Sequence, residues 1–331
     1  MPSLPVLTSI FQPEAVAQHL SAAYDLGGAA SCSFFRQGLN DTYWVVGGNG
    51  RHYCLRVYRH GWRSSEAVQA EIDLLMRLTE AGLPVSVPIA DAMGEWVQEW
   101  DAPEGVRLAV LFAAAPGIMV KDTAVSQSRT LGQIAGRLHS LTDSLELTYP
   151  RPKFDETYFI HEPLRNIQAI WGEKSAELDM LARLGERLER WLVELPCEPP
   201  FSGLCHGDLH SENVHFTEDG EATLFDFDCF GYGCRAYDLA TFLWSRYLFA
   251  SSEQKRQRTW LAFLEGYERE RPLPMNTLPA VLRFVVLRQL WVMGIHAGAV
   301  THHYGRRWLD EGYAAKHFGL LQRLVSDFKL A

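Results

Sequence analysis

The sequence has few cysteines, and their spacing defines neither a disulfide framework nor a metal-binding cluster. The chain has 331 residues, and its six cysteines form no CxxC pair; they are Cys32, Cys54, Cys197, Cys205, Cys229 and Cys234. In a chain of this length, such a scatter is typical of reduced thiols. The spacing therefore predicts a cytoplasmic protein and argues against a small disulfide-stabilised secreted domain.

The sequence also lacks a basic block, a secretory signal and a long apolar run without charges. Acidic residues number 40 against 31 Lys and Arg, which gives a net charge of −9 and argues against nucleic acid as the main partner. The N-terminus has neither a basic region nor an apolar core. The most apolar long stretch, 281–300, contains Arg283 and Arg288, so we expect a buried helix and no membrane span. Nothing indicates an oligomeric state.

The first part of the chain is β-rich. Aromatic and β-branched runs at 34–46 and 51–58 flank a glycine-rich turn, which predicts a hairpin. An amphipathic helix that begins near Ser64 or Ser65 follows, and another strand occupies 108–114. Pro116-Gly117 then interrupts the pattern.

Beyond this break, helical periodicity dominates. It covers residues 131–141, 165–195, 236–270, 277–300 and 306–329, with one β insertion at about 203–228. We therefore predict an α+β fold with a β-rich lobe at 1–115 and a mostly helical lobe at 116–331.

The β insertion contains the residues that are most informative about chemistry. Asp219-Gly220 predicts a two-residue turn, and in that register Asn213 lies opposite Asp226. Asp208 falls in the loop just before this end of the hairpin. Two carboxylates and an amide are thus expected to converge.

This grouping suits phosphoryl transfer. The reaction needs a carboxylate that orients an attacking hydroxyl and accepts its proton, a role that fits Asp208. It also needs hard oxygen ligands for Mg²⁺, a role that fits Asn213 and Asp226.

At this point the sequence resembles a known family. The segments His206-Gly207-Asp208 with Asn213, Phe225-Asp226-Phe227 and Tyr237-Asp238-Leu239-Ala240 resemble motifs of the aminoglycoside phosphotransferase/choline kinase superfamily, which includes homoserine kinases and bacterial stress-response kinases. The resemblance extends from about Phe34 to Trp244. It implies a two-lobed protein-kinase-like fold, with ATP bound between the lobes and a hydroxyl compound as acceptor.

The resemblance also implies roles for residues of the first lobe. Gly38 and Asn40 would belong to a turn that covers phosphate, and Glu71 would pair with the base that grips phosphate. That base is Arg56, where protein kinases and many family members have Lys. Phe112 falls where the adenine-binding hinge would be.

In the second lobe, Phe225 would form the floor of the adenine site, and His206 would brace the catalytic loop.

Several alternatives remain open at the level of sequence. The acceptor can be a small molecule, such as an amino alcohol, homoserine or an aminocyclitol, or it can be a protein Ser/Thr side chain. Alternatively, the protein binds a nucleotide for a regulatory purpose and has little turnover. Asp228 is either a further metal ligand, a substrate-orienting group, or a solvated or hydrogen-bonded acid.

The C-terminal part leaves a further question open. Its aromatic and polar residues either line an acceptor pocket or pack in the core; they are Trp291, His296, His302, Tyr304, Trp308, Asp310 and Glu311.

Overall fold

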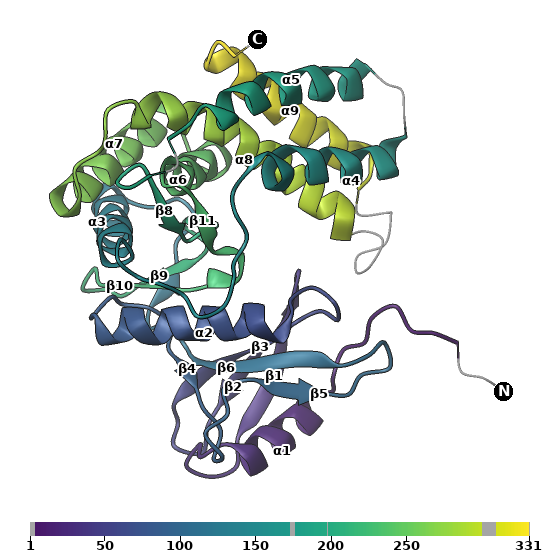
Figure 1. Cartoon of the computed structure of the whole chain (residues 1–331). Helices are drawn as coiled ribbons and strands as arrows, with labels where there is room; N and C mark the ends of the chain where they lie inside the picture. Colours follow the sequence, from purple (N-terminus) through teal and green to yellow (C-terminus); the bar gives the residue numbers. More distant parts are fainter. Residues whose placement is uncertain (1–3, 173–175, 197, 300–308, 331) are drawn as a thin grey trace. The chain divides into compact units, whose positions relative to one another are not determined.

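A computed structural model describes residues 4–172, 176–196, 198–299 and 309–330 of the chain (Figure 1). The architecture is α+β, as predicted. The chain forms two compact units. The sheet unit contains 1–116, 146–150 and 223–225, and the helical unit contains 117–145, 151–222 and 226–331. The predicted assignment of nucleotide binding to 1–115 and of the acceptor site to 116–331 stays a prediction.

An antiparallel six-stranded sheet forms the centre of the sheet unit. Its order is β1-β2-β3-β6-β4, with β5 paired to β6. The strands are β1 (Ser31–Gln37), β2 (Asp41–Val46), β3 (His52–Val57), β4 (Pro88–Ile89), β5 (Gln98–Trp100) and β6 (Arg107–Ala113). The predicted hairpin is present as β2 and β3, whose register pairs Thr42 with Arg56.

One face of this sheet carries the apolar core of the unit. Tyr43, Val45, Leu55 and Val57 alternate along β2 and β3 and are buried. They share this core with residues of helix α1 (Pro13–Ala23), which the sequence analysis did not predict. Because neighbouring residues of a strand point to opposite faces, the side chain of Arg56 lies on the other face.

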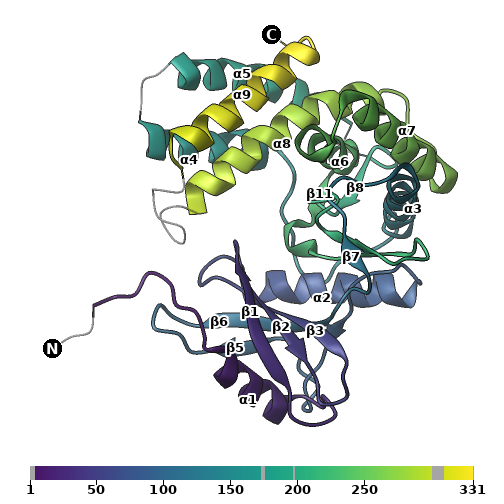
Figure 2. The same cartoon turned by 180° about the vertical axis from the view of Figure 1, so that it is seen from behind.

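Helix α2 (Ser65–Glu80) begins as predicted. The side chain of Ser64 caps it by accepting a hydrogen bond from the Ala67 nitrogen at 3.2 Å. In Figures 1 and 2, α2 runs along one side of the sheet and α1 lies on the other. Glu71 is buried on the inner face of α2.

Helices make up most of the other unit. They are α3 (Val125–Leu141), α4 (Glu162–Trp171), α5 (Ala176–Val193), α6 (Ala236–Phe249), α7 (Glu253–Glu270), α8 (Thr277–Ala299) and α9 (Glu311–Asp327). A short π-helical turn, Thr157–His161, precedes α4. The helical pattern predicted over 236–270 forms two helices, because the chain leaves α6 at Ala250 and Ser252 caps α7. The helical pattern predicted over 165–195 likewise forms two helices, α4 and α5.

Helix α8 occupies the centre of this unit. It packs against α4, α6 and α9 (Figure 2). By length and composition it could cross a membrane, yet 72% of its most apolar window is buried inside the structure. A core helix of a soluble protein passes the same test, so its composition is weak evidence for a span.

Short strands carry the segment from 202 to 234. They are β8 (Ser202–Cys205), β9 (Val214–Phe216), β10 (Ala222–Leu224) and β11 (Gly231–Cys234). Strand β8 pairs with β11, and β9 lies between β10 and β7 (Ile118–Met119). The predicted two-residue turn is wrong: Thr217 N donates to Glu221 O at 2.9 Å, which leaves a three-residue loop. Gly220 supplies the positive φ of 83° that such a loop requires, and the register shifts by one residue.

Candidate functional site

The loop between β8 and β9 carries Asp208, the predicted base. One oxygen of its carboxylate, Oδ1, accepts hydrogen bonds from an Arg288 nitrogen and from His210 Nε2, the latter at 3.1 Å. The other oxygen, Oδ2, accepts from Asn213 Nδ2 at 3.0 Å. The side chain is 20% exposed, so the carboxylate is held firmly while part of it still faces solvent.

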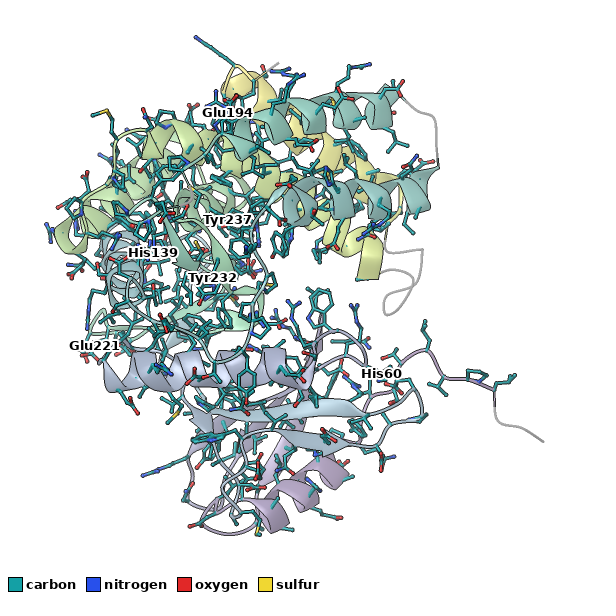
Figure 3. All side chains as sticks on the ribbon, viewed as in Figure 1. His60, His139, Glu194, Glu221, Tyr232 and Tyr237 are labelled. Carbon is teal, nitrogen blue, oxygen red and sulfur yellow. The ribbon has the colours of Figure 1, made fainter. Side chains whose placement is uncertain are left out.

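The carboxylate of Asp238 accepts hydrogen bonds from the backbone of this loop. Its Oδ2 accepts from the His206 nitrogen at 2.7 Å, and its Oδ1 accepts from the Gly207 nitrogen at 2.9 Å. His139, labelled in Figure 3, donates from Nε2 to Asp238 Oδ2 at 3.0 Å and is fully buried. Asp238 and His139 together therefore brace the loop that carries Asp208.

His206 and His210 also bond within the loop. His206 Nδ1 accepts from the Asp208 nitrogen at 3.1 Å, which confirms its predicted bracing role. His210 Nδ1 accepts from the Glu212 nitrogen at 3.1 Å, so the proton lies on Nε2, which points at Asp208. Both rings thus form hydrogen bonds within the loop.

Asn213 is oriented by the same loop. Its amide nitrogen donates to the Asp208 carbonyl at 2.9 Å and to the Asp208 carboxylate. Because the nitrogen is committed to these bonds, the amide oxygen is the atom that can ligate a cation. Asp208 and Asn213 are thus brought together as predicted.

The charges around Asp208 favour its ionised form. Burial opposes ionisation, but the positive charge of Arg288 and the hydrogen bond from His210 hold the pKa of the Asp208 carboxyl well below its usual range. The sequence analysis used Arg288 only as an argument against a membrane span and missed its contact with Asp208. A buried arginine within an apolar helix was the signal that could have identified it.

Asp226 follows β10 and begins the 3₁₀ turn Phe227–Cys229. Its backbone is left-handed, with φ 65° and ψ 59°, a conformation that non-glycine residues rarely adopt and that often occurs at functional sites. The ring of Phe227 packs on His206 with 4.3 Å between centroids. Asp226 therefore lies next to the loop that carries Asp208. Asp228 is buried, so it is not a solvated acid.

The sheet unit contains a second predicted group. Arg56 Nη1 donates to Glu71 Oε1 at 2.8 Å, and Tyr58 Oη donates to Glu71 Oε2 at 2.9 Å. The guanidinium carbon lies 5.1 Å from the ring centre of Phe112. Arg56, Glu71 and Phe112 are thus adjacent, and Phe112 is buried against the arginine.

Gly38 and Asn40 form the turn between β1 and β2. The Gly38 nitrogen donates to the Asn40 carbonyl at 3.0 Å, and Asn40 Oδ1 accepts from the Arg59 nitrogen at 3.3 Å. The turn is therefore fixed by its own hydrogen bonds. Phe225, which directly follows β10, is half-buried.

One further cluster has metal-ligand chemistry but is already committed to other bonds. The ligand atoms of His139, Cys205 and Asp238 lie within 4.8 Å of one another. His139 Nδ1 bonds to Tyr267 at 2.8 Å and its Nε2 to Asp238, while burial raises the pKa of the Cys205 thiol well above its usual value. A protonated thiol and a fully bonded imidazole are poor ligands, so this cluster braces the core.

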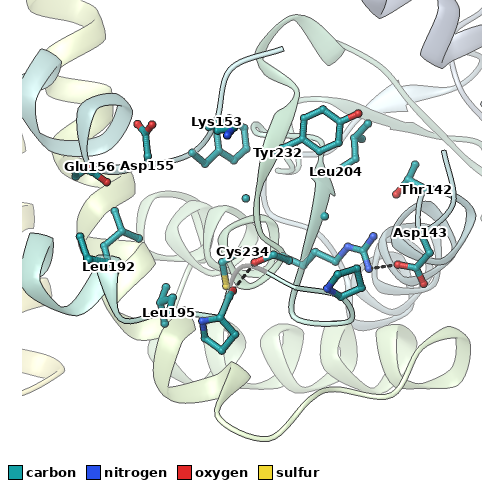
Figure 4. A pocket seen from close by; sticks show the side chains of 18 of the residues that line it. Thr142, Asp143, Lys153, Asp155, Glu156, Leu192, Leu195, Leu204, Tyr232 and Cys234 are labelled. Atoms are coloured by element: carbon teal, nitrogen blue, oxygen red, sulfur yellow. Dashed lines mark hydrogen bonds and ion pairs between the residues drawn. The ribbon is translucent and has the colours of Figure 1, made fainter. Parts of the chain in front are cut away.

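The helical unit also has a cavity of about 590 Å³ beside β8 and β11 (Figure 4). Its walls include Phe154, Leu192 and Tyr232, and at one edge Arg235 forms an ion pair with Asp143. Among the described residues that line it, none belongs to the predicted site. The cavity is therefore separate from the side chains of Asp208, Asn213 and Asp226.

For some of the C-terminal residues, the choice between acceptor pocket and core can be examined in the structure. Trp291 is buried and stacks on Tyr158 with centroids 5.6 Å apart, and His296 bonds to Tyr313 at 2.8 Å. Asp310 caps α9 through the Tyr313 nitrogen. His302, Tyr304 and Trp308 lie outside the described residues.

Residues 31–273 match the model of the phosphotransferase enzyme family. A protein of unknown function from Deinococcus radiodurans is 38% identical over 316 residues, which cover 94% of this chain and 90% of that protein. A homoserine kinase from Phenylobacterium zucineum is 26% identical, over 81% of this chain and 82% of its own.

Two solved structures have the same fold over nearly the whole chain. An amicoumacin kinase, solved in complex with AMP-PNP, Ca²⁺ and Ami, superposes with a TM-score of 0.78 at 23% identity and covers 96% of this chain and 93% of its own. A microcompartment-associated aminopropanol kinase gives a TM-score of 0.77 at 26% identity, with coverage of 96% and 99%. The predicted kinase-like α+β fold is confirmed.

Proposed function

Because the chain belongs to the phosphotransferase enzyme family, we propose that it transfers the γ-phosphate of Mg-ATP to a hydroxyl group of a small amino alcohol or hydroxy amino acid. The observation that carries this proposal is the Asp208 carboxylate, held by three donors in a loop braced by Asp238.

Asp208 is the base of the proposed reaction. The acceptor hydroxyl attacks the γ-phosphorus, its proton passes to Asp208, and the bond from phosphorus to the bridging oxygen of ADP breaks. Since Oδ1 already accepts two hydrogen bonds, Oδ2 is the oxygen that receives the hydroxyl proton.

Asn213 and Asp226 would hold the metal. An amide oxygen and a carboxylate are hard donors, so this pair fits Mg²⁺ better than a softer metal. Bound magnesium would neutralise charge on the β- and γ-phosphate oxygens.

Arg56 would bind phosphate oxygens while it stays paired with Glu71. A guanidinium can bond to a carboxylate and to a phosphate at the same time, so the replacement of Lys is compatible with activity. Gly38 and Asn40 would cover the phosphates, while Phe112 and Phe225 would contact the adenine.

The acceptor class is supported by relatives that span nearly all of the chain. The aminopropanol kinase and the homoserine kinase act, by their names, on small hydroxyl compounds that carry an amine. We therefore place amino alcohols and homoserine before aminocyclitols and protein side chains as acceptors.

The test is ADP release with Mg-ATP across a panel of aminopropanol, homoserine, ethanolamine, an aminocyclitol and a generic protein substrate. We expect acceptor-dependent turnover that falls at least about 100-fold in Asp208→Ala, as for loss of a general base. The matched control is Asp219→Asn, which changes an exposed turn residue and should leave turnover unchanged.

Turnover only with the protein substrate would overturn the small-molecule proposal. Nucleotide binding without turnover on any acceptor would indicate a regulatory protein.

A further inference from the structure

Arg288 lies in the middle of α8 and reaches the catalytic loop at two points. Its Nη2 donates to Asp208 Oδ1, and its Nη1 donates to the Gly207 carbonyl at 3.2 Å. The side chain is only 4% exposed. One planar group therefore contacts both the carboxylate of Asp208 and the peptide that precedes it.

Hydrogen bonds and aromatic rings hold the guanidinium of Arg288 in place. Nη1 also donates to Tyr237 Oη at 3.0 Å, and the rings of Trp244 and Trp291 lie 5.2 and 4.5 Å from the guanidinium carbon. Trp244 is itself held, because its Nε1 donates to Gln289 Oε1 at 2.9 Å. Residues of α6 and α8 thus leave the arginine little rotamer freedom.

Packing alone does not explain this placement. Arg288 Nε is buried without a hydrogen-bond partner among the described residues. Such an unpaired donor typically destabilises a fold by about 1–3 kcal/mol. The orientation that leaves it unpaired is the one that satisfies Gly207 and Asp208.

We propose that Arg288 is the positioning residue for Asp208: by holding Oδ1 and the Gly207 carbonyl together, it presents Oδ2 to the acceptor hydroxyl. This inference rests on the proposed function, in which Asp208 is the base. A lysine would keep the charge but not the fork, so it could hold only one of the two oxygen atoms well.

The experiment compares Arg288→Gln and Arg288→Lys with wild type under saturating Mg-ATP. We expect Arg288→Gln to lower kcat by about 100-fold, in the range typical of a positioned acid or base, with the KM for ATP within about twofold. Arg288→Lys should recover part of the loss. Arg283→Gln is the matched control on the same helix, since Arg283 contacts Trp191 and its own helix and should leave kcat unchanged.

A double-mutant cycle separates positioning from a general structural effect. In an Asp208→Asn background, whose residual turnover is measured at high enzyme concentration, Arg288→Gln should change kcat by less than about twofold, because the group it positions is gone. An equal loss in both backgrounds would overturn the inference.

An unchanged kcat in Arg288→Gln would also overturn it. If the glutamine variant does not fold, the lysine variant decides, and wild-type kcat in that variant has the same meaning. If the wild-type protein shows no turnover on any acceptor, the proposed function itself is overturned. If the wild type and the Arg288 variants are equally active, only the role of Arg288 is overturned.

Discussion

At the scale of single residues, Arg56 stands where protein kinases and many family members have Lys, and it forms an ion pair with Glu71. Glu71 is 2% exposed and Arg56 is 12% exposed, so each charge depends on the other. Removal of one partner from such a buried pair leaves an uncompensated charge, whereas replacement of both by apolar groups is often neutral. The pair can therefore serve stability, phosphate binding or both, and substitutions can separate these roles.

Arg56→Met should destabilise the protein by about 3 kcal/mol, because Glu71 remains buried with Tyr58 as its donor. The double variant Arg56→Met, Glu71→Met should recover most of that stability but not the affinity for ATP. Urea unfolding and ATP titration measure the two effects. If the double variant recovers its affinity for ATP, Arg56 does not contribute to nucleotide binding.

At the scale of elements, the loop that carries Asp208 depends on a close approach of two backbones. Gly207 has φ 80°, and a Cβ at this position would lie 2.1 Å from the carbonyl oxygen of Cys229. The 3₁₀ turn after Asp226 therefore lies directly against the residue that precedes Asp208. Gly220, in the loop between β9 and β10, has a similar φ of 83° but open space around it.

This contrast gives a matched pair of alanine substitutions. Gly207→Ala should destabilise the protein by about 3 kcal/mol, from overpacking and a left-handed alanine together, and should abolish turnover. Gly220→Ala should cost about 1 kcal/mol, from backbone conformation alone, with turnover kept. Thermal unfolding and kcat measure both variants. Equal losses of stability would mean that the contact with Cys229 is unimportant.

The sequence predicted local features of these elements better than their long-range contacts. The helix start near Ser64 and the hairpin of β2 and β3 follow from local patterns alone. The loop at Gly220 has three residues where two were predicted, because Asp-Gly is compatible with both loops. The contact between Arg288 and Asp208 joins residues 80 positions apart, and no local pattern encodes such a distance.

At the scale of the whole molecule, the chain passes between the two units several times. Residues 223–225 belong to the sheet unit although the residues on both sides of them belong to the helical unit. Leu224 donates to the Pro84 carbonyl at 2.9 Å and accepts from the Ser86 nitrogen at 2.9 Å. The sheet unit therefore includes a segment that only the later part of the chain supplies.

This interleaving predicts that the full chain unfolds in one cooperative transition. Loss of the helical unit releases both ends of residues 223–225, and the backbone groups of Pro84 and Ser86 then lose their partners. We expect circular dichroism and tryptophan fluorescence to give coincident urea transitions. At a concentration of 100 times its Kd, Mg-AMP-PNP should raise the free energy of unfolding by about 2.7 kcal/mol without splitting the transition.

A fragment of residues 1–116 provides the control for this prediction. It lacks the strand segment around Leu224, so it should be less resistant to proteolysis than the same residues in the full chain. Two separated transitions in the full chain, or a fragment as resistant as the parent, would show that the sheet unit is stable by itself. Coincident transitions with a labile fragment would mean that residues 223–225 join the folding of one unit to that of the other.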